Sequence, residues 1–474
     1  MKAFFLHCVN KKSIFSFSAL IAFCVLNITF PSKLSAYTIE DLELAMETNS
    51  PELRKLEEEY KQSLLDVKDA KAGLGPTVDL QMSGTYMLNP PVGPVYLSVD
   101  DILNSISWPA GISPSSAGQY LKIYDGMEST LYNFNLSVTQ PVFTWGKLID
   151  AVKLYKDVSE IKKLQLESQE KQMRTELKTR LISLYYLERI LEFLEEEKLY
   201  AARLVETSEN AEKSGMLLVQ DVVEAKIQAK ELEIAQRDVL EQIQNQLLEL
   251  ERMTGLQNLE ISLLDYEFYE NETLSVMNLD RHQAEEMALS GNQQSIKMLE
   301  KLKDVNVAAG KIAKASVNWK PDVALQASAS YGGPRFPFFE PNWYRKDDYS
   351  INISLGLKVT VWDGGKKLND VSRKISETRV ADINKIDART SIKKNLSSQW
   401  NALDVCLMKI DYQKLKIESA DAKIKQQENM YSSGYGSESD VLSAKIAKCN
   451  EQIEKERLSL NLAVACMTIS YLCY

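Results

Sequence analysis

The 474-residue sequence has few of the residues that break helices and few of those that bind metals. It contains only two histidines, His7 and His282, and six cysteines, so a zinc site built from His and Cys ligands is not expected. The 13 prolines and 19 glycines are few for this length and occur in clusters, which leaves long stretches free to form helices. No constellation of serine, cysteine or carboxylate residues is typical of a catalytic site. We therefore expect no enzymatic activity, no metal and no cofactor.

Positive charge is also scarce. The formal net charge is −10, and the first 36 residues carry four lysines and no acid, so the remainder has 52 basic and 66 acidic residues, a net charge of −14. Nucleic-acid binding is not expected, because phosphate backbones select surfaces rich in lysine and arginine. With 45% hydrophobic and 26% charged residues, the chain is typical neither of disorder nor of a helical membrane bundle.

One long apolar run occurs, and it lies at the beginning of the chain. Residues 1–36 have the pattern of a signal peptide, with three lysines before the apolar stretch 14–30 and a small residue, Ala36, for cleavage. No other apolar run of this length follows, so cleavage is favoured over the alternative of a retained membrane anchor. Lipidation of Cys24 is a further alternative, disfavoured by the bulky residue before it.

The rest of the chain contains two copies of one unit. Pro76, Leu80, Gln81 and Tyr86 recur 245 residues later as Pro321, Leu325, Gln326 and Tyr331. Gly146, Gly215, Asp221 and Lys226 recur 219 residues later as Gly365, Gly434, Asp440 and Lys445. The shift falls from 245 to 219, so the first copy has a loop 26 residues longer than the second. The shift of 219 then stays constant, which indicates packed helices that tolerate no insertion. We divide the chain into a signal peptide (1–36), a first helix–hairpin–helix repeat (37–254), a connecting segment (255–279) and a second repeat (280–474).

Four segments alternate strictly between apolar and polar residues, which predicts strands with one apolar and one polar face. They cover residues 78–88, 131–140, 323–331 and 349–361. Their length of about 10 residues fits a tilted membrane-spanning strand. A half-buried sheet in a soluble protein would give the same pattern.

Two segments predict helices of unusual length. Residues 147–213 and 366–432 each contain 67 residues without proline or glycine. At about 1.5 Å per residue, each helix would be about 100 Å long. Shorter helices are expected over 39–72 and 217–254. Leucines at positions 177, 181, 184, 187, 191 and 194 have the spacing of coiled-coil packing. A cytosolic coiled-coil protein would explain these helices, but neither the signal peptide nor the strands.

A sheet of four strands has two unpaired edges, and lipid cannot satisfy them. We therefore expect closure with further copies of the chain. Two copies would give eight strands with a filled interior, and three would give twelve with room for water. Both ends of each hairpin lead to helices, so the loops 89–129 and 332–348 lie on the opposite side of the membrane. The second loop holds Phe336, Phe338, Phe339, Trp343 and Tyr344.

The order of these elements, together with two similar turns, resembles the TolC-type outer-membrane efflux family over nearly all of residues 38–474. The turns are Ser214-Gly215…Asp221-Val222-Val223-Glu224-Ala225 and Tyr431-Ser432-Ser433-Gly434…Asp440-Val441-Leu442-Ser443-Ala444. The resemblance implies a mainly α fold with membrane β-hairpins in a homotrimer. Its long antiparallel helices would form a periplasmic α-barrel, and four strands per chain would contribute to a 12-stranded β-barrel.

The function implied by the resemblance is that of an outer-membrane export duct. It would be a passive channel of a tripartite efflux or type I secretion system, located in the outer membrane with its helices in the periplasm. Its partners would be outer-membrane lipid, a periplasmic adaptor protein and an inner-membrane transporter. A surface adhesin or structural protein on the same scaffold is the alternative.

The resemblance also implies that the two turns form a periplasmic tip around an entrance ringed by acidic residues. By position, Asp440 matches a ring aspartate, Ser443 stands in place of a second one, and Tyr431 matches a constriction tyrosine. Asp221 matches the acidic partner region of a latch whose arginine is replaced here by Gly436.

Each of these acids also has a purely structural interpretation. Asp221 and Asp440 lie in the first turn of a helix, where an acid contributes about 0.3–1 kcal/mol through the helix dipole. Ser437 and Asp440 further have the spacing of a capping box. Gly215 and Gly434 are expected to end helices in the left-handed conformation.

Two cysteines are expected at similar heights on antiparallel helices. Cys406 lies 28 residues before Gly434 and Cys466 lies 32 residues after it. The height difference is about 6 Å at about 1.5 Å per residue, so either a disulfide or two buried free thiols fit the sequence.

Overall fold

The computed structural model describes residues 36–115, 117–290, 294–317, 319–334, 336 and 348–473. The predicted signal peptide up to residue 35, including Cys24, and most of the aromatic loop 332–348 lie outside the described residues. None of the helices in the described ranges combines the length and the hydropathy needed to cross a membrane.

The chain forms two compact units, and both long helices contribute to each. One unit comprises the described residues up to Arg54 with 170–287 and 395–473, and the other comprises 55–169 and 288–394. The long helices are α5 (Lys147–Lys213) and α10 (Lys366–Ser432), and each has 67 residues. Their predicted bounds are confirmed.

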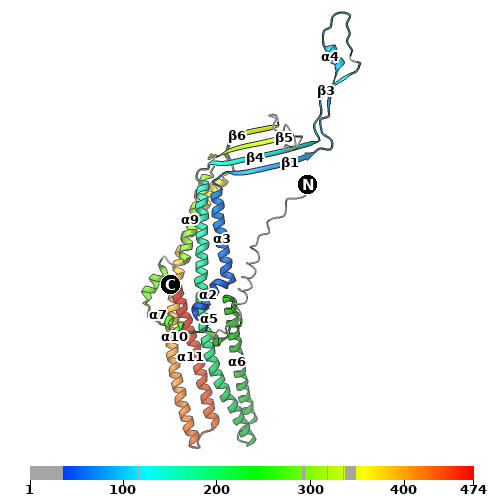
Figure 1. The fold of residues 1–474 in the computed structure, drawn as a ribbon. Helices are drawn as coiled ribbons and strands as arrows, with labels where there is room; N and C mark the ends of the chain where they lie inside the picture. Colours follow the sequence, from blue (N-terminus) through cyan, green and yellow to red (C-terminus); the bar gives the residue numbers. More distant parts are fainter. Residues whose placement is uncertain are drawn as a thin grey trace, which may run out of the picture. The chain divides into compact units, whose positions relative to one another are not determined.

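The second unit contains a four-stranded antiparallel sheet in the order β1-β4-β5-β6 (Figure 1). Its strands are β1 (Thr77–Tyr86), β4 (Thr130–Phe143), β5 (Asp322–Gly333) and β6 (Tyr349–Lys358). Each repeat supplies one hairpin, and the pairing of β4 with β5 joins the two hairpins. The four predicted strands are confirmed, although β6 ends at Lys358 rather than at 361.

Helices α3 (Pro51–Ala72) and α9 (Gln294–Ala315) occupy equivalent positions in the two repeats, and each has 22 residues. In the unit with the sheet, ion pairs connect the helices in the order α3, α5, α9, α10. They join Lys162 to Glu59 at 2.8 Å, Lys301 to Glu160 at 2.5 Å and Lys303 to Asp382 at 2.8 Å.

The other unit contains the ends of α5 and α10 together with α6 (Val219–Thr254) and α11 (Glu438–Cys473). Contacts connect them in the order α6, α5, α11, α10. They are Lys226–Glu209 at 2.7 Å, Asn450–Glu197 at 2.8 Å and Lys445–Glu428 at 3.1 Å. Five of the six leucines predicted to pack are buried here; the members are Leu177, Leu181, Leu184, Leu187 and Leu194.

Short elements complete this unit. They are α2 (Ile39–Asn49), the 3₁₀ turn Ile261–Leu263, α7 (Phe268–Met277) and α8 (Arg281–Leu289). Helix α7 packs on α5 and α11 through a cluster that contains Tyr186, Tyr269 and Met467. The four described cysteines are free thiols, so Cys406 and Cys466 are not bonded to each other.

The prediction of one continuous helix over 39–72 is wrong. The chain breaks at Ser50, whose φ of −57° and ψ of 121° are not helical. Pro51 follows, and its ring disfavours the helical conformation in the residue before it. Pro51 itself begins α3, where its missing N–H is not needed.

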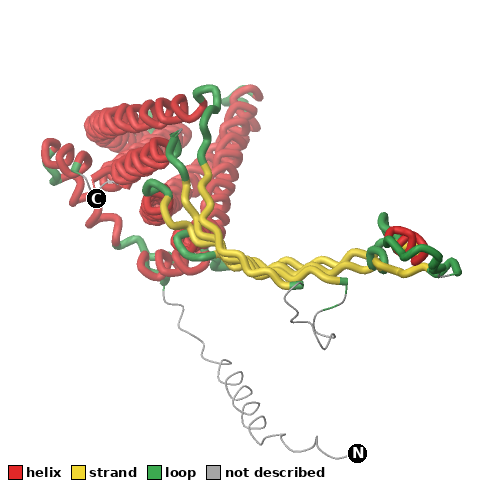
Figure 2. The backbone as a smooth tube through the Cα atoms, turned by 90° about the horizontal axis from the view of Figure 1, so that it is seen from above, coloured by secondary structure: helices red, strands yellow, loops and turns green. Residues whose placement is uncertain are grey.

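The predicted loop 89–129 contains regular secondary structure. It contains β2 (Val95–Ser98), α4 (Val99–Ser105) and β3 (Tyr120–Tyr124). Strands β2 and β3 pair with each other in a second, two-stranded sheet. Figure 2 shows this ribbon continuing from the main sheet and ending at α4.

Candidate channel wall and entrance

The strand register aligns side chains of one kind across all four strands. One row contains Leu80, Leu136, Ala329 and Ile351, and the next contains Val78, Val138, Ala327 and Ile353. Polar rows alternate with them: Asp79, Ser137, Ser328 and Asn352 lie between these two rows, and Gln81, Asn135, Ser330 and Ser350 lie on the other side of the Leu80 row. Because successive side chains point to opposite faces, one face of the sheet is apolar and the other is polar.

Much of the apolar face is uncovered, although Tyr331 near one end is buried. Ile351, Ile353, Leu355 and Leu357 of β6 are 64–80% exposed, and Val78, Leu80 and Met82 of β1 are 58–63% exposed. Contiguous apolar surface of this extent marks contact with lipid or with another protein. On the polar face, the hydroxyl oxygens of Ser330 and Ser350 lie 2.6 Å apart in a hydrogen bond.

Three tryptophans lie where the strands meet the helices. Trp145 follows β4, Trp319 precedes β5, and Trp362 follows β6; their exposed fractions are 41%, 72% and 81%. Trp145 donates its indole N–H to the carbonyl of Pro321 at 3.0 Å. Tryptophan is enriched at membrane–water interfaces, because its ring is apolar and its N–H is polar.

The two helical hairpins of the other unit turn in the same way. Gly434 has φ of +76° and donates its N–H to Tyr431 at 3.0 Å, while Tyr435 donates to Met430 at 2.9 Å. Gly215 has φ of +69° with the corresponding bonds. This is the Schellman ending, in which a left-handed residue lets the last carbonyls of a helix find donors.

Replacing Gly434 with alanine should destabilise the protein through the backbone alone. A Cβ at this position would meet no atom within 4 Å, so the expected cost is the left-handed strain of about 1–2 kcal/mol. Gly73→Ala is the control, because its φ is not positive and its new Cβ would make only ordinary contacts. Denaturant unfolding compares the two variants, and an equal effect would contradict the assignment.

Both predicted entrance aspartates, Asp440 and Asp221, cap helices. Asp440 accepts hydrogen bonds from the hydroxyl of Ser437 at 2.7 Å and from its N–H at 3.2 Å, and these bonds hold the pKa of the carboxyl below its usual range. The Ser437 hydroxyl oxygen in turn accepts from the N–H of Asp440 at 3.1 Å, which completes the capping box. Asp221 accepts from the N–H of Leu218 at 3.1 Å. The structural interpretation of these two acids is therefore correct; it leaves their carboxylates exposed at the helix tips.

The remaining predicted entrance residues lie on the α10–α11 hairpin. Tyr431 and Ser443 are exposed, the first at the end of α10 and the second one turn beyond Asp440. Gly436 donates its N–H to the carbonyl of Met430 at 3.1 Å. A Cβ on Gly436 would lie 3.1 Å from the Cβ of Met430, so a larger side chain here requires its neighbours to shift.

An ion pair that the sequence did not reveal connects the two hairpins near their tips. Arg203 of α5 donates to Glu438 of α11 at 3.1 Å and to Glu206 at 2.8 Å. Arg203 and Glu438 are 235 residues apart, and no spacing rule relates them. The ion pairs Glu209–Lys226 and Glu428–Lys445 occupy equivalent positions in the two repeats. The sequence repeat is therefore also a repeat of side-chain contacts.

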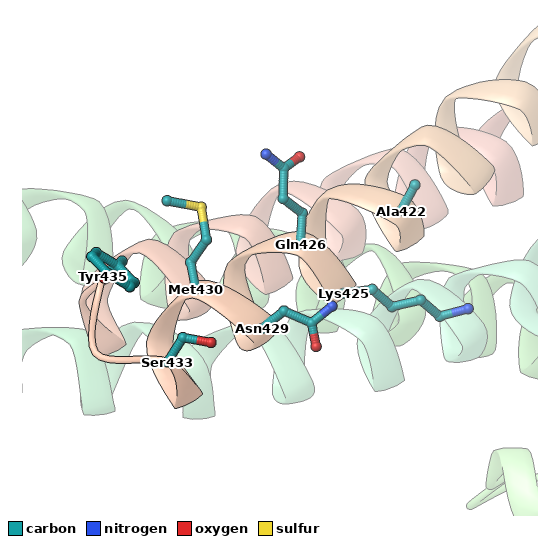
Figure 3. A pocket seen from close by; sticks show the side chains of 7 residues that line it. All are labelled: Ala422, Lys425, Gln426, Asn429, Met430, Ser433 and Tyr435. Atoms are coloured by element: carbon teal, nitrogen blue, oxygen red, sulfur yellow. The ribbon is translucent and has the colours of Figure 1, made fainter.

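Two shallow grooves run along the hairpins close to these turns. The first is lined by residues of α10 and the following turn (Figure 3), namely Ala422, Lys425, Gln426, Asn429, Met430, Ser433 and Tyr435. The second lies between α5 and α6, lined by Lys198, Ala202, Val205, Lys226, Ala229, Lys230 and Glu233. Each is lined by small residues together with lysine side chains.

Two repeated hairpins in one amphipathic sheet, continued by paired long helices, define the fold of the TolC-type outer-membrane channels. Residues 45–256 match the family model described as outer membrane efflux protein. The resemblance drawn from the order of the elements is thereby confirmed. Comparison with curated protein sequences finds no match.

Solved structures agree with this fold over most of the chain. A membrane protein from Pseudomonas aeruginosa has a TM-score of 0.70 at 12% identity, covering 92% of this chain and 93% of its own. VceC, an outer membrane protein of Vibrio cholerae, has a TM-score of 0.63 at 16% identity over 90% and 95%. The CmeC outer membrane channel of Campylobacter jejuni has a TM-score of 0.67 at 11% identity over 91% and 84%. At these identities the likeness is one of fold.

Proposed function

We propose that the protein is an outer-membrane export duct, a passive channel for substrates that an inner-membrane pump delivers. The observation that carries this function is the sheet with one uncovered apolar face and one polar face. In a closed barrel the apolar rows face lipid and the polar rows line a water-filled bore. The exposed Trp145, Trp319 and Trp362 at the helix-side end of the strands support a membrane–water interface there, with the helices in the periplasm.

Closure requires several copies of the chain. Strands β1 and β6 are the two ends of the sheet, and lipid cannot satisfy their free backbone groups. The helices have open edges too, since α6 and α10 are the outer members of their order. Each of these helices has exposed apolar residues at helical spacing. They include Val223, Ile227 and Ile234 on α6, and Met408, Tyr412 and Leu415 on α10. Three copies give twelve strands and a bore wide enough for water, so we propose a homotrimer.

The helical tips are the proposed entrance and the proposed docking site. We propose that a periplasmic adaptor protein docks at the grooves beside Tyr435 and between α5 and α6. Around a threefold axis, three copies of Asp440 form a ring of carboxylates, with Ser443 and Tyr431 on the same hairpin. Such a ring attracts cations and makes the channel selective for cations over anions.

Asp440→Asn should reduce the cation preference of the channel, and Asp221→Asn is the matched control. Each carboxylate accepts the N–H of the residue three positions earlier at a helix start, so each variant loses a similar helix-dipole contribution of about 0.3–1 kcal/mol. Reversal potentials under a salt gradient measure the preference. A fall in both variants extends the ring to Asp221, whereas unchanged preference in Asp440→Asn would overturn the ring.

Conductance of the detergent-purified protein in planar bilayers tests the proposed function. Stable, stepwise conductance by an oligomer is expected. An oligomer that inserts but does not conduct would favour an adhesin or structural protein on this scaffold. A monomer that stays soluble without detergent would overturn both, and would leave a periplasmic coiled-coil protein with a soluble sheet.

A further inference from the structure

The described residues between β1 and β4 form an arm, defined here as residues 87–115 and 117–129. Its base continues the hairpin, because Met87 donates its N–H to Ser129 at 2.7 Å and Met127 donates to Val92 at 2.9 Å. The ribbon of β2 and β3 follows, closed by α4 (Figure 1). The corresponding loop of the second repeat is 26 residues shorter.

Specific hydrogen bonds hold the far end of the arm together. Ser98 caps α4 by accepting from the N–H of Asp101 at 3.4 Å. The carboxylate of Asp100 accepts from the N–H of Gly118 at 3.1 Å, and the indole of Trp108 donates to the carbonyl of Leu103 at 2.7 Å. The arm therefore has a defined shape that can fit a partner.

Both faces of the ribbon expose large side chains. Leu97 lies opposite Leu121 on one face, and Tyr96 lies opposite Lys122 on the other. Leu97, Tyr96 and Leu121 are 38–55% exposed, and α4 contains no buried residue. A two-stranded ribbon of this size is marginally stable in water, so its apolar surface needs a partner.

The position of the arm in the sheet indicates which partner that is. The arm continues directly from β1, and β1 is one end of the strand order β1-β4-β5-β6. In a closed ring, β1 pairs with β6 of the neighbouring copy, so the arm leaves the sheet at the boundary between two copies. On the β4 side the arm adjoins β5 of its own chain, and on the β1 side the next protein surface in such a ring belongs to the neighbouring chain.

We propose that the arm is an inter-subunit clasp, whose ribbon packs on a second copy of this chain beyond the β1–β6 boundary. The clasp rests on the proposed function, because it presupposes the closed ring. The contact made by the arm would extend the β1–β6 interface between neighbouring copies, which the unpaired edge of β1 already requires. Each copy supplies one arm and receives one, so the contacts close by the same symmetry as the strands.

Thermal dissociation of the detergent-purified oligomer tests the clasp. One variant replaces residues 93–126 with a two-residue Asn-Gly turn, and another carries Leu97→Asp with Leu121→Asp. Both should dissociate at least tenfold faster than the parent protein at a fixed temperature. The control carries Ser107→Asp with Ser113→Asp, which adds the same charge to exposed serines of the arm and should behave like the parent.

The outcomes separate the clasp from the duct. If the parent forms a conducting oligomer and both arm variants dissociate at the parental rate, the clasp is overturned and the duct stands. If the variants keep the parental dissociation rate but insert poorly into phospholipid vesicles, the arm contacts lipid and the clasp is also overturned. If the parent neither oligomerises nor conducts, the proposed function itself fails.

Discussion

Ile353→Arg should abolish insertion into the outer membrane, whereas Asn352→Arg, one residue earlier, should not. Ile353 is 75% exposed on the apolar face near the middle of β6. An arginine facing lipid at the midplane costs about 2–4 kcal/mol per chain, and a trimer carries three. Asn352 pairs with Ser328 on the polar face, where an arginine would face water. Envelope fractionation followed by quantification of the oligomer measures insertion.

The matched pair also distinguishes a membrane sheet from a soluble one. Asn352→Arg should retain the oligomer and shift its ion selectivity toward anions, because the new charge lines the bore. Normal insertion of Ile353→Arg would contradict the lipid-facing assignment. Loss of insertion in both variants would show that β6 tolerates no charge on either face, and would contradict the water-filled bore.

Glu197→Gln should stabilise the protein at pH 8 and have little effect near pH 4.5. Glu197 is 1% exposed between α5 and α11, and burial raises the pKa of its carboxyl to about 7. One carboxyl oxygen accepts from Asn450 at 2.8 Å, and the other has no hydrogen-bond partner among the described residues. Since the folded state favours the protonated form of Glu197, the stability of the protein falls as the pH rises from about 4.5 to about 7.

The expected gain follows from the size of this shift. At about 1.4 kcal/mol per pKa unit, a shift from 4.5 to about 7 corresponds to up to about 3 kcal/mol at pH 8. Glutamine keeps the acceptor for Asn450 and removes the buried charge. Guanidinium unfolding followed by circular dichroism at pH 5 and pH 8 measures the difference. Glu196→Gln is the control, because Glu196 lies in an exposed hydrogen bond with Tyr200. A Glu197→Gln protein that is less stable at pH 8 would contradict the argument.

The long elements were predictable because their signals are local and repeated many times. Sixty-seven residues without proline or glycine specify α5, and the same count specifies α10. Alternation over ten residues specifies each strand, and the register then follows from matching apolar to apolar residues across the sheet. Asp221 and Asp440 were predictable as caps because capping depends only on neighbours in sequence.

Three features were not predicted from the sequence, because their signals are weak, are not local, or conflict with a stronger local pattern. The break at Ser50 is signalled by Pro51, but the helical pattern on both sides favoured one continuous helix. The ribbon of the arm has only four or five residues per strand, too few for periodicity, among prolines that favour loops. Glu197 follows two further glutamates, so its sequence context resembles a solvated face, and only the packing against α11 shows that it is buried.

The equal length of α5 and α10 restricts how this chain can change. Ion pairs at matching positions, Glu209–Lys226 and Glu428–Lys445, fix the phase of each hairpin. One residue added to α5 alone would rotate every later side chain by about 100° and move the contact surface away from α11. Seven residues added to both helices, with seven more in α6 and α11, would nearly restore the phase. A longer or shorter relative of this protein should therefore differ by whole heptads, inserted in four places at once.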